Sequence, residues 1–310
     1  MEQQYLDMMR RILDMGDYKS AARENLPGTK EIFVQMIRHD LQKGFPLLTT
    51  REMPIRGTFE ELKWFLKGST DVRELIRNKC NFWSEDVYKF NKKGYDKFPD
   101  YDLWLEVIKN TETESSHTDA GELYGKLWRN FNGDTDQICN LVNRILKEPN
   151  SRYQIVSAWN PSVVSRGLSA LPSCHMIWQT NVREGKYLDL VMMQRSCDIP
   201  IGVPVNIASY ALLIHILCLI LPYYPGELIW IGNSAHIYEN QFETCEEQLS
   251  RTPRELPQLN IKLRPYIQNT WVSEELTDFF DSLRFEDIEL INYNPHPKLK
   301  YTFSSGLIKK

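Results

Sequence analysis

The spacing of hydrophobic residues along the chain predicts helices and strands in mixed order. Apolar side chains recur at helical spacing over residues 2–15, and Gly16 ends this helix. The same spacing predicts further helices at residues 58–66, 72–77, 103–108, 141–146 and 206–221. Runs rich in β-branched and aromatic residues predict strands at residues 32–41, 153–159, 175–182, 187–196 and 227–238. The runs at 153–159, 175–182 and 187–196 should be neighbours in one sheet, with helix 206–221 packed on it.

One segment interrupts this pattern. Residues 84–120 are polar and rich in Lys, Asp and Thr, with a helical stretch only around residues 103–108. Such composition is typical of a surface excursion or small lobe. We find no internal repeat and no low-complexity stretch, so we expect one catalytic domain over residues 1–310.

Composition narrows the classes of function. The chain has 41 acidic and 37 basic residues and a net charge of -4, so no overall field attracts nucleic acid, and any bound phosphate needs a local arginine site. The apolar run 207–222 contains Ser209, Tyr210 and His215 and is shorter than the ~20 residues of a bilayer crossing, which predicts a buried helix and no membrane partner. The amino terminus lacks the features of a signal peptide, so we expect a cytoplasmic protein.

The six cysteines are scattered without paired spacing, which indicates neither a metal site nor a disulfide framework. Cys174 lies just before a predicted strand, where nearby cations could free its thiolate as a nucleophile. The adjacent His175 is a poor base for it, because successive strand side chains point to opposite faces. By itself this pair is more often structural, since free cysteine is a common core residue.

Three polar groups follow predicted strands or open the long helix. Residues 194–198 place Arg195 beside Ser196, a combination that suits a phosphate. Asn206 opens the apolar helix, and its amide donates and accepts at once, as a pyrimidine edge requires. His236 and Tyr238 alternate at a strand end, so both side chains are able to face one cleft and bind sugar hydroxyls.

Seven sequence strings together resemble thymidylate synthase and its pyrimidine hydroxymethylase relatives. They are GFPLLTT at 44–50, EELKWFLKGST at 60–70, YGKLWR at 124–129, SRYQIVSAWNP at 151–161, LPSCHMIWQ at 171–179, QRSCDIPIGVPVNIASYALL at 194–213 and HIYENQ at 236–241. The resemblance spans almost the whole chain. It implies a thymidylate synthase-like α/β (α+β) fold with a mixed, predominantly antiparallel sheet covered by helices, and a homodimer that packs sheet against sheet.

The resemblance also implies the reaction and its residues. Methylenetetrahydrofolate would donate a one-carbon unit to C5 of dUMP, without a metal. Cys174 would attack C6, Glu61 would order the water that moves protons, Tyr124 would assist deprotonation of C5, and Asn206 would read the pyrimidine. The substrate would be bound by Gln194, Arg195, Ser196, His236 and Tyr238, with Arg152 from the other subunit and Arg23 as a stand-in for a missing phosphate-site arginine. The folate would be bound by Arg51, Phe82, Trp83 and Asp198.

Departures from the family pattern lie mainly where the folate and the closing carboxyl terminus bind. Tyr153 replaces a second arginine of the phosphate site, Asp86 replaces a second tryptophan, Ser234 and Ala235 replace residues of a Gly-Asp-Thr-His stretch, and the chain ends in YTFSSGLIKK. An altered lid would admit water to the C5 methylene, so we expect 5-hydroxymethyl-dUMP slightly ahead of the alternative, methylation to dTMP. A cysteine hydrolase and an inactive nucleotide-binding homologue are more remote alternatives.

Overall fold

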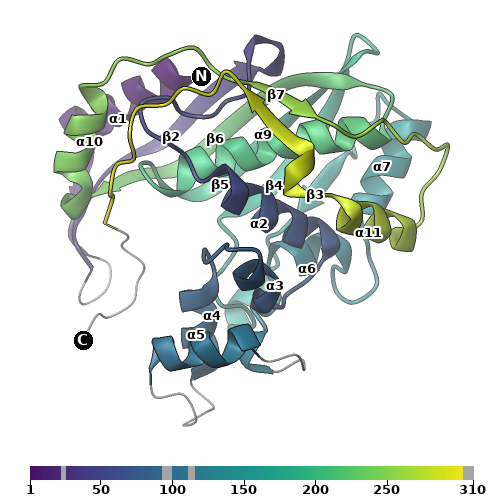
Figure 1. Cartoon of the computed structure of the whole chain (residues 1–310), viewed down its shortest axis with the longest axis horizontal. Coiled ribbons are helices and arrows are strands. Elements are labelled where there is room, and N and C mark those ends of the chain that lie inside the picture. Colours follow the sequence, from purple (N-terminus) through teal and green to yellow (C-terminus); the bar gives the residue numbers. More distant parts are fainter. Residues whose placement is uncertain (22–25, 93–99, 111–115, 303–310) are drawn as a thin grey trace. The chain divides into compact units, whose positions relative to one another are not determined.

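The computed structural model describes residues 1–21, 26–92, 100–110 and 116–302, and the chain divides into two compact units (Figure 1). The first unit comprises residues 1–55, 180–266 and 286–310, and the second comprises residues 56–179 and 267–285. Each unit is therefore discontinuous in sequence, and predicted site residues occur in both.

The first unit is built on a mixed sheet. Its strands are β1 (Asp17–Lys19), β2 (Thr29–Asp40), β6 (Tyr224–Tyr238) and β5 (Tyr187–Asp198), lying side by side in that order. The β1/β2 and β2/β6 pairs are antiparallel, whereas β5 and β6 run parallel. Because the parallel register pairs Ser196 with Ser234 and Asp198 with His236, the polar residues at the ends of both strands lie together.

Helices cover this sheet. Helix α9 (Gly202–Ile220) packs on β5 and β6, and α1 (Glu2–Met15) packs on β2 and β6 and against α10 (Phe242–Leu249). By length and composition alone α9 could cross a membrane, but 78% of its apolar window is buried inside the protein. It is the central core helix, as the interrupted apolar run predicts. A separate antiparallel pair is formed by β7 (Gln258–Ile261) and β8 (Ile288–Ile291), and short 3-10 helices are η1 (Leu41–Lys43), η3 (Glu239–Gln241) and η4 (Phe285–Asp287).

The second unit is mainly helical. Its helices are α2 (Ile55–Lys67), α3 (Val72–Arg77), α4 (Ser84–Lys92), α5 (Tyr101–Asn110), η2 (Ser116–Thr118), α6 (Tyr124–Arg129), α7 (Gln137–Lys147), α8 (Pro161–Arg166) and α11 (Ser273–Ser282). Strand β3 (Ile155–Ser157) pairs with the first half of β4 (His175–Arg183) in antiparallel register. An aromatic core joins these elements: the ring centroids of Phe65 and Tyr124 are 4.7 Å apart and those of Trp128 and Trp178 are 5.8 Å apart. This core fixes α2 and α6 close to the loop before β4.

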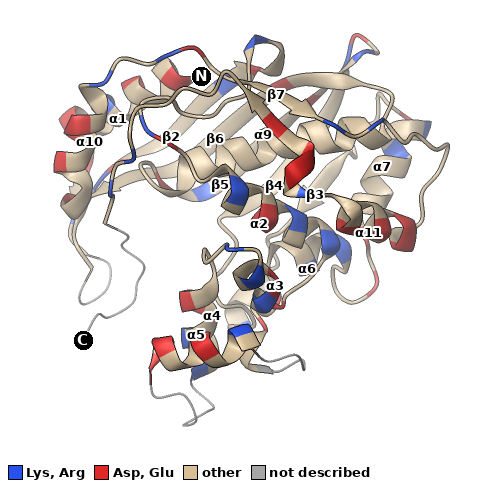
Figure 2. Ribbon diagram, in the orientation of Figure 1, with Lys and Arg blue, Asp and Glu red and all other residues tan. Residues whose placement is uncertain are grey.

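The predicted fold class is confirmed, because the chain is a mixed α/β protein with a mostly antiparallel sheet flanked by helices. The helix at residues 2–15 is confirmed with its bounds, while the strand expected at 153–159 is only three residues long. The described part of the polar segment 84–120 contains two α-helices, α4 and α5, and the 3-10 helix η2, where one helix was expected, and both α-helices carry acidic and basic residues (Figure 2). One domain over residues 1–310 stays a prediction.

Candidate active site

The predicted nucleophile is positioned by a tyrosine. Cys174 is the last residue before β4, and its backbone N–H donates to the phenol oxygen of Tyr124 at 2.6 Å. The N–H of His175 approaches the same oxygen at 3.3 Å. Since both backbone groups are donors, the phenol oxygen is the acceptor for both. Cys174 is partly exposed, and Tyr124 is only 3% exposed and held by its ring contact with Phe65, so the pair joins an accessible thiol to a fixed phenol.

A second pair in the same unit joins an acid to an indole. The carboxylate of Glu61, on α2, accepts a 2.7 Å hydrogen bond from Nε1 of Trp83. Burial raises the pKa of Glu61 to about 7, although the hydrogen bond from Trp83 opposes this change. A carboxyl group with such a pKa exchanges protons near neutral pH, as a general acid or base requires. The ring of Trp83 also lies 6.0 Å from that of Tyr124, so both predicted proton-transfer residues contact the same indole.

In the first unit, three side chains form a relay that ends at Asn206. Nε1 of Trp230 donates to Oε1 of Gln194 at 2.9 Å, and Nε2 of Gln194 donates to Oδ1 of Asn206 and to the backbone oxygen of Ser196, each at 3.0 Å. An indole N–H only donates and a backbone carbonyl only accepts, so Gln194 has a single favourable amide orientation. The orientation of the Asn206 amide follows from it.

This orientation has a consequence for the pyrimidine. With Oδ1 turned to Gln194, Asn206 keeps its NH2 group and the second lone pair of Oδ1 for a ligand. Uracil offers an acceptor at O4 and a donor at N3, which match these groups. Cytosine offers a donor at C4 and an acceptor at N3, and would require the flipped amide. The relay therefore favours uracil over cytosine.

His236 and Tyr238 lie together at the end of β6, as their spacing predicts. Their ring centroids are 5.2 Å apart and nearly perpendicular. Nδ1 of His236 is 3.0 Å from the backbone oxygen of Ser234, an acceptor, so Nδ1 carries the proton. Burial lowers the pKa of His236, which favours the neutral ring. Its Nε2 is then an acceptor for a hydroxyl group.

Asp198 ends β5 as a partly buried acid. Burial raises its pKa to about 6. Nε2 of Gln241 lies 3.5 Å from both carboxylate oxygens and 3.2 Å from the backbone oxygen of Thr302, and Oε1 of Gln241 accepts from the N–H of Tyr238 at 3.0 Å. A carboxylate offers two acceptors to adjacent N–H groups, such as those of a pterin ring. Gln241 thus connects the predicted folate acid to a predicted sugar-binding residue and to the carboxyl-terminal segment.

The remaining predicted binding residues differ in setting. Arg195 and Ser196 are partly buried near the end of β5, and Arg152 is exposed. Phe82 is 38% exposed and lies so close to Gly57 that a Cβ there would meet its ring at 2.7 Å. Two others complete the set: Arg51 is buried in the first unit, and Arg23 lies outside the described residues.

Within each unit the predicted residues form clusters. Glu61, Trp83, Tyr124 and Cys174 gather in the second unit, and Gln194, Asp198, Asn206, His236 and Tyr238 gather at the strand ends and the start of α9 in the first unit. Sequence reasoning gave no role to Trp230 or Gln241. Trp230 was one apolar position in a strand, and Gln241 was part of a matching string, so neither signal showed which side chain it contacts.

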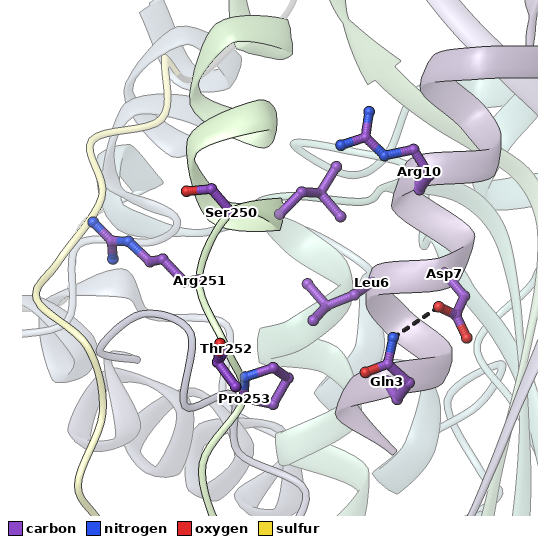
Figure 3. Close-up of a pocket in the computed structure, with 9 residues that line it drawn as sticks. Gln3, Leu6, Asp7, Arg10, Ser250, Arg251, Thr252 and Pro253 are labelled. Carbon is purple, nitrogen blue, oxygen red and sulfur yellow. Dashed lines mark hydrogen bonds between the residues drawn. The ribbon is translucent and has the colours of Figure 1, made fainter.

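A pocket of about 350 Å³ lies elsewhere in the first unit, between α1 and residues 249–253 (Figure 3). Two arginines line it. Arg10 makes two hydrogen bonds to Glu246, at 2.9 and 2.8 Å, and Arg251 donates to Glu247 at 2.7 Å. Because each guanidinium is already paired with a carboxylate, the pocket is no match for the predicted nucleotide or folate site.

Comparison with known proteins agrees with this set of side chains. The family model for thymidylate synthase matches residues 3–305. The thymidylate synthases of Mycoplasma mobile and Enterobacteria phage T4 are each 40% identical to this chain over 300 residues, covering 96% of it and 98% of theirs. That of Aster yellows witches'-broom phytoplasma is 39% identical over 291 residues, which covers 93% of this chain and 95% of its own. The predicted nucleophile, the buried acid and the oriented amide thus occur in a chain that belongs to the thymidylate synthase family, one-carbon transferases that act on dUMP with methylenetetrahydrofolate.

Proposed function

We propose that this protein is a thymidylate synthase, which methylates C5 of dUMP to give dTMP and releases dihydrofolate. The observation that carries the proposal is similarity over 93–96% of the chain, at 39–40% identity, to three proteins named thymidylate synthase. Hydroxymethylation, which the altered folate side led us to expect, is the second candidate. Similarity along the whole chain outweighs a few changed positions on one side of the site.

The proposed roles follow the chemistry of each side chain. Cys174 attacks C6 of the pyrimidine and makes C5 nucleophilic. Asn206, held by Gln194, binds O4 and N3–H, and the neutral ring of His236 accepts a hydrogen bond from the sugar hydroxyl together with Tyr238. Arg195 and Ser196 bind the phosphate, with Arg152 contributed by the second subunit of a homodimer.

Two groups move protons in this proposal. Glu61, with its pKa raised to about 7, holds or releases a proton near neutral pH through ordered water. Tyr124, whose phenol oxygen lies 2.6 Å from the Cys174 nitrogen, assists removal of the C5 proton. Fixed placement of both groups beside Trp83 means that no large rearrangement is needed to align them.

Two of the predicted folate residues suit a pterin by their chemistry. Asp198, in the first unit, has two carboxylate oxygens for pterin N–H groups, and Trp83, in the second unit, has an apolar indole ring. The bound folate supplies the one-carbon unit and then the hydride that completes a methyl group. Arg51 and Phe82 complete this side in the proposal, and a cytoplasmic location suits soluble substrates of this kind.

One observation favours the second candidate. Asp86, where relatives carry a second tryptophan, is 7% exposed, and burial raises its pKa to about 6. An acid in place of an indole is able to hold water beside the folate wall, and water at the C5 methylene would give the hydroxymethyl product.

Product analysis tests the proposal. The protein is incubated with dUMP and methylenetetrahydrofolate, and the nucleotide is analysed by mass spectrometry while the folate product is followed by absorbance. Methylation predicts dTMP and dihydrofolate in equal amounts. 5-Hydroxymethyl-dUMP with tetrahydrofolate would refute the proposal and establish the second candidate.

A further inference from the structure

A buried carboxylate in the first helix takes no part in the chemistry above. Glu2, at the start of α1, is 4% exposed. Its oxygens accept from the N–H of Thr49 at 2.9 Å, the hydroxyl of Thr49 at 2.7 Å and the N–H of Thr50 at 2.8 Å. A carboxylate is costly to bury unless donors satisfy it, and here three donors come from two consecutive residues. Glu2 therefore fixes the backbone at residues 49–50.

The fixed backbone leads directly into Arg51. This guanidinium is 8% exposed, donates from Nη2 to the backbone oxygen of Pro200 and lies over the ring of Tyr301, 5.2 Å from its centroid. Among the described residues its Nε has no hydrogen-bond partner. A buried guanidinium with an unused N–H is suited to an anionic ligand, provided that its position is held.

A second route connects the same residues from the other side. Nε2 of Gln248 donates to the hydroxyl of Thr50 at 2.9 Å, and the hydroxyl of Tyr301 donates to Oε1 of Gln248 at 2.6 Å. Gln248 is fully buried. Thr50 is thus held by Glu2 through its backbone and by Gln248 through its side chain, and Gln248 also orients the ring beneath Arg51.

We infer that Glu2 is a positioning residue for folate binding, which acts through Thr49 and Thr50 on Arg51. The inference rests on the proposed function, in which Arg51 belongs to the folate side, and it adds that the guanidinium binds an anionic group of the folate. Glu2 touches neither substrate. It fixes the position of Arg51 before folate binds, so that binding costs less conformational entropy.

The test replaces Glu2 by glutamine, which keeps the size of the side chain but places an NH2 group where N–H donors now point. Turnover is measured as tritium release from C5-labelled dUMP, a readout shared by methylation and hydroxymethylation. We expect the KM for methylenetetrahydrofolate to rise about tenfold, the scale of hydrogen bonds to a charged group. The KM for dUMP should stay within about twofold, because the weakened step is folate binding.

The matched control is Glu246→Gln. Glu246 also joins α1 to another element, through Arg10, but this ion pair is surface-exposed, with Glu246 at 52%, and it does not contact residues 49–51. Surface ion pairs contribute little. Both KM values should therefore stay within about twofold in this variant.

A double-mutant cycle separates positioning from general destabilisation. If Glu2 acts through Arg51, adding Glu2→Gln to Arg51→Lys should raise the folate KM far less than it does in the wild-type background. Should Glu2→Gln fail to fold, Thr49→Val removes one donor and keeps both backbone donors, and a smaller rise in folate KM is expected. Equal effects in both backgrounds, or an unchanged folate KM, would overturn the inference, whereas no tritium release by the wild type would instead refute the proposed function.

Discussion

Removing the indole N–H of Trp230 should weaken discrimination between dUMP and dCMP. In Trp230→Phe, the buried Oε1 of Gln194 loses its 2.9 Å donor while the aromatic ring is kept. In the variant, flipping the Gln194 amide no longer places its NH2 group against an indole N–H. The flip still places Oε1 against the backbone oxygen of Ser196, so this contact alone opposes it. One of two constraints on the orientation of Asn206 is lost.

The size of the effect follows from that one hydrogen bond. A buried neutral hydrogen bond contributes about 1 kcal/mol, and an unsatisfied buried acceptor costs about 1–3 kcal/mol. We therefore expect the ratio of kcat/KM for dUMP to kcat/KM for dCMP to fall by about 5- to 150-fold, with most of the change in the dCMP value. The assay is tritium release from each C5-labelled nucleotide at saturating folate.

The control is Trp64→Phe. Trp64 is equally buried, at 1% exposed, and its Nε1 donates to the backbone oxygen of Asp71 at 3.1 Å, so the same group and a similar bond are lost in the second unit. Both variants should be less stable, but only Trp230→Phe should change the specificity ratio. An unchanged ratio in Trp230→Phe, or an equal change in both variants, would refute the relay.

Three further predictions concern catalysis, pH and stability. Cys174→Ala should abolish turnover in a folded protein that still binds dUMP by calorimetry, and retention of about one per cent of wild-type activity, a barrier only ~2.7 kcal/mol higher, would exclude covalent catalysis by this thiol. Burial raises the pKa of Glu61 to about 7, so the folded state binds more protons than the unfolded state between about pH 4.5 and 7. The free energy of unfolding should therefore fall as pH rises through this range, and urea titrations of Glu61→Gln should lack this part of the pH dependence. Arg129→Met removes the cation of a buried ion pair, in which Nε and Nη2 of Arg129 donate to Asp136 at 2.9 and 2.8 Å. The free energy of unfolding in urea should fall by about 3 kcal/mol, and a fall of under about 1 kcal/mol would contradict this account of the pair.

The sequence predicts elements whose signals are local. Helix α1 has six buried apolar residues at helical spacing and a glycine directly after it, so its bounds follow from residues 2–16 alone. Strand β5 and helix α9 are predicted as elements for the same reason, but β5 continues two residues past the predicted end, to Asp198, and α9 begins four residues before the predicted start, at Gly202. Helix α4 was missed because it lies in a polar segment, and strands β7 and β8 were missed because each is only four residues long, too short to show a periodic pattern.

For the candidate site, the sequence likewise predicts the residues but not their contacts. Cys174, Asn206 and Asp198 were predicted from residue type and from matching strings. Their settings could not be, because contacts between distant residues create them: Gln194 and Trp230 are 36 positions apart in the chain, and Glu61 and Trp83 are 22 apart. The raised pKa of Glu61 is a property of its burial, and no neighbouring residue in the sequence indicates it.

The fate of the hydride tests the central claim most directly. The reaction is run with dUMP and methylenetetrahydrofolate that carries deuterium at its hydride-donating carbon, and the nucleotide product is examined by mass spectrometry. Synthesis of dTMP predicts that each new methyl group contains one deuterium atom, with dihydrofolate formed in equal amount. A hydroxymethyl product without deuterium, together with tetrahydrofolate that keeps its label, would show that water completes the reaction and would contradict the account.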